Sequence, residues 1–187
     1  MSISIRENKH SGNISPEFAL LGFLITKSSH GYDLHQRFVT ELGHVWHMSQ
    51  SQAYAILKRL EQHGDIKAQI VEQDKLPARQ MLSITTQGRR RFNEWMDEIS
   101  GNSRAIRLEF LSRLYFAQIY KPEKVMKIYE AQSAEIESSI QRLETLLVNL
   151  PPEQQFNQLS LKLRLRQMEL IQEWMRDVKT QIIDTKE

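Results

Sequence analysis

Cysteine is missing from this chain of 187 residues, and glycine is scarce at 7 copies. Without cysteine there can be no disulfide framework, no thiolate nucleophile and no cysteine-based zinc site. The sequence also lacks the glycine-rich P-loop and the GxGxxG fingerprint of dinucleotide-binding proteins. We therefore expect a protein that works without a cofactor.

Other signals of chemistry are missing as well. The six histidines include His44 and His47, but no acidic residue stands close to these two in the sequence. Such a set offers poor ligands for a metal ion. No nucleophile, base and orienting group can be identified from their spacing. The sequence therefore predicts no metal site, no catalytic residues and no enzyme.

Long apolar runs are absent too. The longest extends from Phe18 to Ile25, whereas a membrane-spanning helix needs about 20 apolar residues. Residues 1–13 do not contain the apolar stretch of a signal peptide. A hydrophobic content of 40% and a charged content of 26% are typical of a soluble protein. We expect a cytoplasmic protein that has no membrane partner.

Acidic residues are absent between Glu41 and Glu61, although they are frequent elsewhere. The net charge is only +2. A surface that binds nucleic acid would therefore need a local region, such as this one, that is poor in acidic residues. Within the acid-free stretch, small and apolar residues recur three and four positions apart, which indicates one buried helix face. That face consists of Ala53, Ile56, Leu57 and Leu60.

The rest of this predicted helix is polar. Ser49 or Ser51 can cap its start, and Gly64 suits the left-handed residue that follows a helix end. The remaining side chains are amides, a phenol and two cations: Gln50, Gln52, Tyr54, Lys58 and Arg59. Amides and hydroxyls read base edges in the DNA major groove, and cations contact phosphates. The pattern favours a DNA-reading helix, and a solvated amphipathic helix is the alternative.

The surrounding segments predict a mainly α fold with one hairpin. Helices are expected over Ser15–Thr26, with Ser15 as the cap and Pro16 at the first helical position, then over Tyr32–Leu42 and Met48–Gly64. Strands are expected over Asp65–Gln73 and Ala78–Thr85, followed by a helix that Thr85 or Thr86 caps and that runs through Ile99. Ser28–Gly31 is expected only to interrupt the helical pattern between the first two helices. Three helices, a two-stranded wing and a helix make a winged helix-turn-helix whose third helix is the reader. We expect a flexible N-terminus over 1–14, this domain over 15–100 and a helical domain over 101–187.

The sequence of the second half of the chain predicts only helices. One of them has positions three and four residues apart that form a packing seam, all apolar except Ser133: Met126, Tyr129, Ser133, Ile136, Ile140, Leu143, Leu147 and Leu150. The last helix is apolar over a wider surface than one neighbour can cover, with Leu159, Leu163 and Leu170 included. An uncovered apolar surface favours association. We expect a homodimer that buries roughly 600–900 Å² per partner.

Four motifs stand in the first half: ALLGFL at 19–24, HGYDL at 30–34, AYAILKRLEQHG at 53–64, and PAR at 77–79 with LSITTQG at 82–88. With these motifs, Phe18 to Met96 resembles the PadR family of transcriptional regulators. One departure is in the wing, where Met81 and Leu82 replace frequent aromatic residues and Gln80 replaces a common second cation. The resemblance implies a dimeric repressor that binds operator DNA and is usually responsive to a small molecule.

These observations assign the candidate site residues. The reader helix contributes Ser49, Gln50, Ser51, Gln52, Tyr54 and Lys58 or Arg59 to DNA binding. The resemblance adds Lys75 and Arg79 at the wing turn. Tyr32 either donates to a phosphate or closes the core. Trp95 and Trp174 are candidates for the pocket of a small aromatic effector, or they are ordinary packing residues.

A second class of function fits the same sequence. The near-neutral charge and the apolar seam would suit a helical adaptor that binds other proteins and carries a degenerate winged helix. Binding to DNA separates the two hypotheses.

Overall fold

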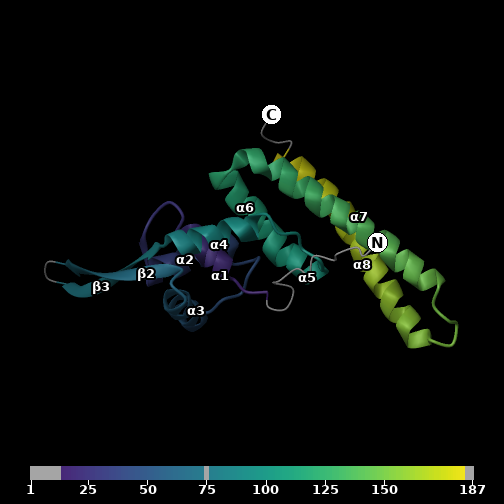
Figure 1. Ribbon diagram of the computed structural model, residues 1–187, viewed down its shortest axis with the longest axis horizontal. Helices are drawn as coiled ribbons and strands as arrows, with labels where there is room; N and C mark the ends of the chain where they lie inside the picture. Colours follow the sequence, from purple (N-terminus) through teal and green to yellow (C-terminus); the bar gives the residue numbers. More distant parts are fainter. Residues whose placement is uncertain (1–13, 74–75, 184–187) are drawn as a thin grey trace, which may run out of the picture. The chain divides into compact units, whose positions relative to one another are not determined.

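The computed structural model describes residues 14–73 and 76–183 of the chain. The chain separates into two compact units, Met1–Glu98 and Ile99–Glu187. Figure 1 shows the helices and the hairpin of the first unit and the long helices of the second. The sequence predicts a division after residue 100, close to this boundary.

The described residues of the first unit form four helices: α1 (Glu17–Phe23), α2 (Gly31–Leu42), α3 (Gln50–Gln62) and α4 (Thr86–Met96). The backbone N–H of Glu17 donates to Ser15 Oγ at 3.4 Å, so the expected serine does stabilise the start of α1. Pro16 stands at the cap rather than at the first helical position. At α4, the Thr85 hydroxyl accepts the N–H of Gly88 at 3.1 Å. The expected threonine cap is confirmed.

A three-stranded antiparallel sheet completes the first unit: β1 (Ser29–His30), β2 (Ile66–Gln73) and β3 (Leu76–Ile84). The strand order is β1-β3-β2, and Ile66 lies opposite Ile84. The β2–β3 hairpin projects beyond the helices as a wing (Figure 1). Strand β1 could not be predicted from the sequence, because two residues are too few to show an alternating pattern. Ser29 pairs with Leu82 and His30 with Met81, which satisfies the backbone groups on the other edge of β3.

The core of the first unit is aromatic and aliphatic. Trp95 stacks on Phe18 with ring centroids 5.3 Å apart, and Phe92 lies 5.7 Å from Trp95. Phe23 and Phe38 meet edge to face. All of these rings are almost fully buried. Burial of this apolar surface fixes α1 and α2 beneath α3 and thereby holds the reader helix in place.

The second unit is helical over its described residues. Its elements are α5 (Ser103–Ala105), a π-helical turn η1 (Ile106–Phe110), α6 (Leu111–Tyr120), a short 3-10 turn η2 (Pro122–Lys124), α7 (Val125–Val148), α8 (Gln155–Val178) and a π-helical end η3 (Lys179–Ile183). The two long helices α7 and α8 lie side by side (Figure 1).

The predicted seam of α7 needs one correction. Met126 is exposed, whereas Val125 and Ile128 are buried, so the first turns are out of phase with the expected stripe. Farther along α7, the expected seam positions Ile136 and Leu143 are buried. The reason is Gln132, which is polar but buried, because its side-chain amide binds the backbone of another segment. A pattern that counts only apolar residues passes over such a position.

Candidate nucleic-acid interface

The start of α3 is fixed by a capping box. The Ser49 hydroxyl accepts the Gln52 N–H at 3.2 Å, and the Gln52 side chain accepts the Ser49 N–H at 2.9 Å. This reciprocal pair orients the first turn. Gln50 and Ser51 then stand exposed at the first two helical positions. At the other end Gly64 has φ of +75°, the left-handed conformation that the sequence predicts.

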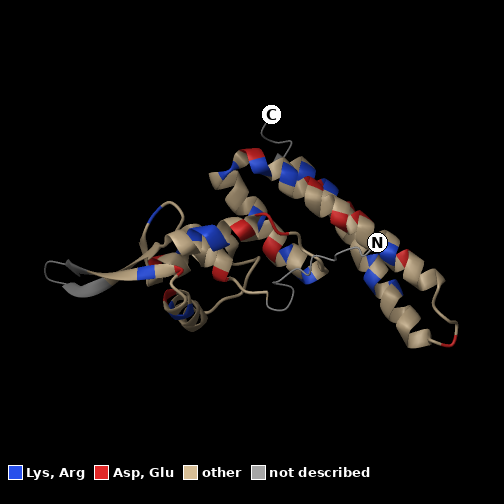
Figure 2. Ribbon diagram, in the orientation of Figure 1, with Lys and Arg blue, Asp and Glu red and all other residues tan. Residues whose placement is uncertain are grey.

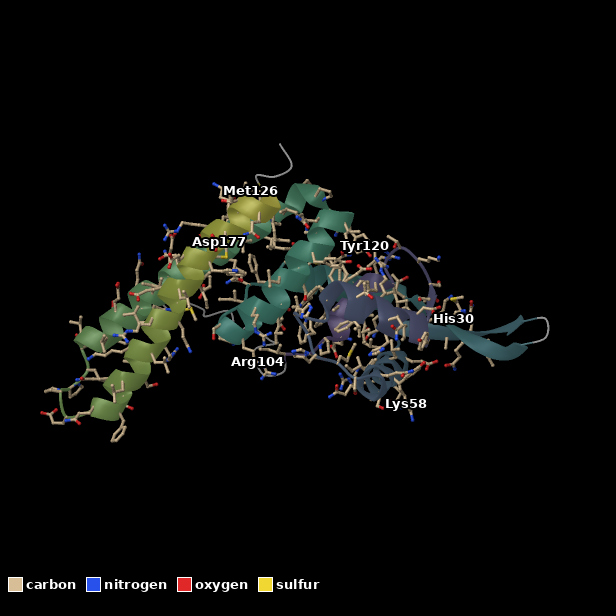
Figure 3. All side chains as sticks on the ribbon, turned by 180° about the vertical axis from the view of Figure 1, so that it is seen from behind. His30, Lys58, Arg104, Tyr120, Met126 and Asp177 are labelled. Atoms are coloured by element: carbon tan, nitrogen blue, oxygen red, sulfur yellow. The ribbon has the colours of Figure 1, made fainter. Side chains whose placement is uncertain are left out.

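A groove runs along one flank of α3. Its volume is ≈ 740 Å³, and it lies between α3, the start of α2 and strand β3. Tyr32 and Tyr54, 54% and 46% exposed, both line it together with Lys58. Figure 3 marks Lys58 on α3 and His30 at the base of the wing. Two phenols and an ammonium therefore supply hydrogen-bond donors along one opening.

The groove has a defined wall and a defined charge pattern. His30 Nδ1 lies 2.9 Å from the Gln80 carbonyl oxygen, which ties β1 to β3 at the edge of the groove. Asp33 and Glu61 also line the groove. A phosphate would be repelled by these carboxylates and attracted by Lys58. The surface that favours an anion is therefore the N-terminal and central part of α3.

The two cations of α3 have different partners. Lys58 lines the groove. The Arg59 guanidinium instead donates to Glu17 at 3.2 Å. The sequence predicts that one of these two cations contacts phosphate, and the geometry distinguishes Lys58 as the one beside the groove. No pattern in the sequence pointed to Glu17, because it lies 42 residues from Arg59.

Residues 20–94 match the model of the transcriptional regulator PadR-like family. The matched residues all lie within the first unit. The reader helix and the wing lie inside the match, and α4 overlaps its end.

Two curated relatives match this chain. It is 26% identical over 116 residues to the negative transcriptional regulator PadR of Bacillus subtilis, covering 62% of this chain and 64% of the relative. It is 30% identical over 80 residues to the probable transcriptional regulator Rv1176c of Mycobacterium tuberculosis, covering 43% and 42%. The chain thus spans less than two thirds of the length of either relative.

A crystal structure of Bacillus subtilis PadR in complex with operator DNA is also similar. The identity is 22%, the match covers 89% of this chain and 98% of that chain, and the TM-score is 0.45.

The sequence also predicts Lys75, Arg79, Trp95 and Trp174 as site residues. Lys75 lies outside the described residues. Arg79 is in β3, paired in register with Val71, and its side chain is not among those described. Trp95 is 2% exposed within the core of the first unit. Trp174 belongs to α8 in the second unit, where it meets Phe110 edge to face at 6.4 Å. The two tryptophans therefore occupy separate packing clusters.

The described ranges contain neither a metal-binding cluster nor a membrane-spanning helix. Among residues 14–73 and 76–183, no group of three or more His, Asp or Glu residues is placed to hold a metal ion. In the same ranges, no helix is both long enough and apolar enough to cross a bilayer.

Proposed function

We propose that the chain is a sequence-specific transcriptional regulator that binds double-stranded DNA as a homodimer and acts as a repressor. The observation that carries this proposal is the exposed, acid-free start of α3 next to a groove lined by Tyr32, Tyr54 and Lys58. The match of residues 20–94 to the model of the transcriptional regulator PadR-like family supports it. Such a protein would act in the cytoplasm, where its operator lies, and would need no catalytic group.

Each part of the α3 surface receives a role. Gln50 and Ser51 occupy the helix start that would enter the major groove, so we assign them to base edges. The hydroxyl of Tyr54, the hydroxyl of Tyr32 and the ammonium of Lys58 line the groove and suit phosphate oxygens. Ser49 and Gln52 mainly orient the helix through the capping box. Lys75 and Arg79 in the wing remain proposed contacts to the minor groove or backbone.

The second unit carries the proposed dimer surface. Four large apolar residues of α8 are exposed: Phe156, Leu159, Leu163 and Leu170, with exposures of 88%, 62%, 59% and 66%. Their spacings of three, four and seven residues put them on one helix face, while Met168 and Met175 are buried elsewhere on the helix. Trp174 is half-buried and packs against Phe110 of the same chain. The uncovered part of this face is proposed to pack on a second copy.

A dimer sets the geometry of the operator. Two reader helices would fit half-sites about one helical turn apart, roughly 34 Å, arranged as an inverted repeat. A small aromatic effector that alters the packing around Trp174 would move the two readers out of register. Trp95 is a weaker effector candidate than Trp174 because it is fully packed between Phe18 and Phe92.

The direct test is an electrophoretic mobility shift with the DNA upstream of the chain's own gene, run over a salt series. We expect a shifted complex at nanomolar protein, an affinity that falls steeply with salt, and protection of an inverted repeat. Absence of a complex at low salt would contradict the proposal. It would favour the adaptor hypothesis, in which the apolar face of α8 binds another protein.

A further inference from the structure

Glu17 joins three parts of the first unit through its two carboxylate oxygens. Oε2 accepts from Arg59 of α3 at 3.2 Å, and Oε1 accepts from Arg91 of α4 at 3.0 Å. Arg91 also pairs with Asp65, which is fully buried at the turn between α3 and β2. In Figure 2 basic residues appear on both α3 and α4, the two helices that Glu17 connects.

The burial of this cluster is graded. The Asp65 side chain is 0% exposed, Glu17 is 16%, Arg91 is 25% and Arg59 is 45%. Arg91 is also held over the Phe18 ring, 5.4 Å from its centroid. Arg91 and Asp65 therefore form a fixed inner pair, whereas Arg59 is the outer, solvent-accessible member. Removing Glu17 would leave the inner pair in place and release Arg59 first.

Arg59 is the cation that follows Lys58 on the reader helix. Adjacent residues on a helix point about 100° apart, so Arg59 borders the outer surface on the side away from the groove. A long arginine side chain there could reach a phosphate of any duplex lying against α3. Such a contact would add affinity without adding sequence information, because phosphate contacts are the same for every sequence.

We propose that Glu17 limits the sequence-independent affinity of the protein for DNA: it holds Arg59 against α1 and so keeps this cation away from the duplex. The inference rests on the proposed function, because it presumes that α3 meets a duplex. The carboxylate fulfils two roles at once. It positions α3 against α1 and α4, and it removes one sequence-independent contact from the reader surface. The result is weaker binding to every duplex and a smaller dependence of the affinity on salt.

The test compares wild type, Glu17→Gln, Arg59→Gln and the double variant, using the full chain and a mixed-sequence duplex of about 30 base pairs. Fluorescence anisotropy over a salt series gives the slope of log affinity against log salt. We expect Glu17→Gln to steepen this slope by about 0.9 for each bound subunit. Between ~50 and ~200 mM salt, that change corresponds to about 3.5-fold more loss of affinity per subunit.

The matched variants separate the possible outcomes. Arg59→Gln alone should leave the slope at the wild-type value, and the double variant should lose the gain seen with Glu17→Gln. With the upstream DNA as second probe, the slope of Glu17→Gln should steepen by the same amount, because a phosphate contact is the same for every sequence. A slope that decreases in Arg59→Gln alone would overturn the inference, even if Glu17→Gln does not fold. An unchanged slope in folded Glu17→Gln would overturn it as well.

The proposed function itself is checked by the wild-type protein in the same experiment. A wild type that binds neither duplex contradicts DNA binding and removes the basis of the inference. A wild type that binds, with Arg59→Gln showing a reduced slope, contradicts only the role of Glu17.

Discussion

A Cβ atom placed on Gly31 would lie 2.9 Å from Cε1 of Tyr54. Gly31 begins α2, and Tyr54 lies one turn into α3, so the ring of the reader helix passes directly over the start of the neighbouring helix. Gly31 does not have a positive φ. A glycine is therefore needed at position 31 because it lacks a side chain, not because of its backbone conformation. It leaves room for the phenol ring of Tyr54, which lines the groove.

Gly31→Ala should therefore weaken DNA binding more than folding. Alanine has a better helix propensity than glycine, by about 1 kcal/mol. This gain opposes the cost of moving the Tyr54 ring, so the free energy of unfolding should change little. The added methyl displaces the Tyr54 ring, and losing one hydrogen bond to phosphate should lower affinity for the upstream DNA about fivefold. Binding is measured by anisotropy and stability by urea unfolding. Gly101→Ala is the matched control, because nothing lies within 4 Å of that position.

Lys58→Gln should reduce the salt dependence of binding. Lys58 is exposed and lines the groove on α3, so its ammonium can replace a counterion on the DNA backbone. Removing it should lower the slope of log affinity against log salt by about 0.9 per bound subunit, for operator and mixed DNA alike. Lys127→Gln, an exposed lysine of α7, removes the same charge from the second unit. Equal slopes for both variants would exclude Lys58 as a phosphate contact.

Features that depend on neighbouring residues could be predicted from the sequence. The Ser49 cap, the left-handed Gly64 and the Thr85 cap each follow from a residue type next to a helix end. The winged helix-turn-helix followed from periodicity because its helices and strands are long enough to show one. The polar face of α3 was also predictable, since the burial of Ala53 and Leu60 fixes the opposite side of the helix.

Features that depend on distant residues could not be predicted. The bond between Glu17 and Arg59 joins positions 42 apart, and neither residue type has a spacing rule at that separation. Strand β1 exists only because β3 offers a free edge next to it. The phase of α7 changes near Gln132, because the buried amide is satisfied by a partner from another segment. In each of these cases the local structure depends on a residue or strand that is distant in the sequence.

Leu163→Glu should separate the proposed dimer. Leu163 is 59% exposed on the same α8 face as Phe156 and Leu159. A carboxylate buried at the centre of an apolar interface is costly to desolvate, so association should weaken by at least tenfold. Sedimentation velocity at micromolar protein measures the result. Arg164→Glu is the control, because it puts the same new carboxylate one position away on an exposed side. A wild type that sediments as a monomer would contradict the dimer itself.

Gln132→Leu should destabilise the second unit although leucine is apolar and similar in size. The Gln132 amide accepts the Ser100 N–H at 3.0 Å and donates to the Ser100 carbonyl at 2.9 Å. Gln132 and Ser100 are each 2% exposed. Leucine would leave both backbone groups buried without these bonds, at a cost of about 1–3 kcal/mol for each group. Urea unfolding should therefore give a lower midpoint than for Gln141→Leu, an exposed position of the same helix. Faster hydrogen exchange at the Ser100 amide would locate the loss, and equal midpoints for the two variants would mean that the amide does not hold this segment.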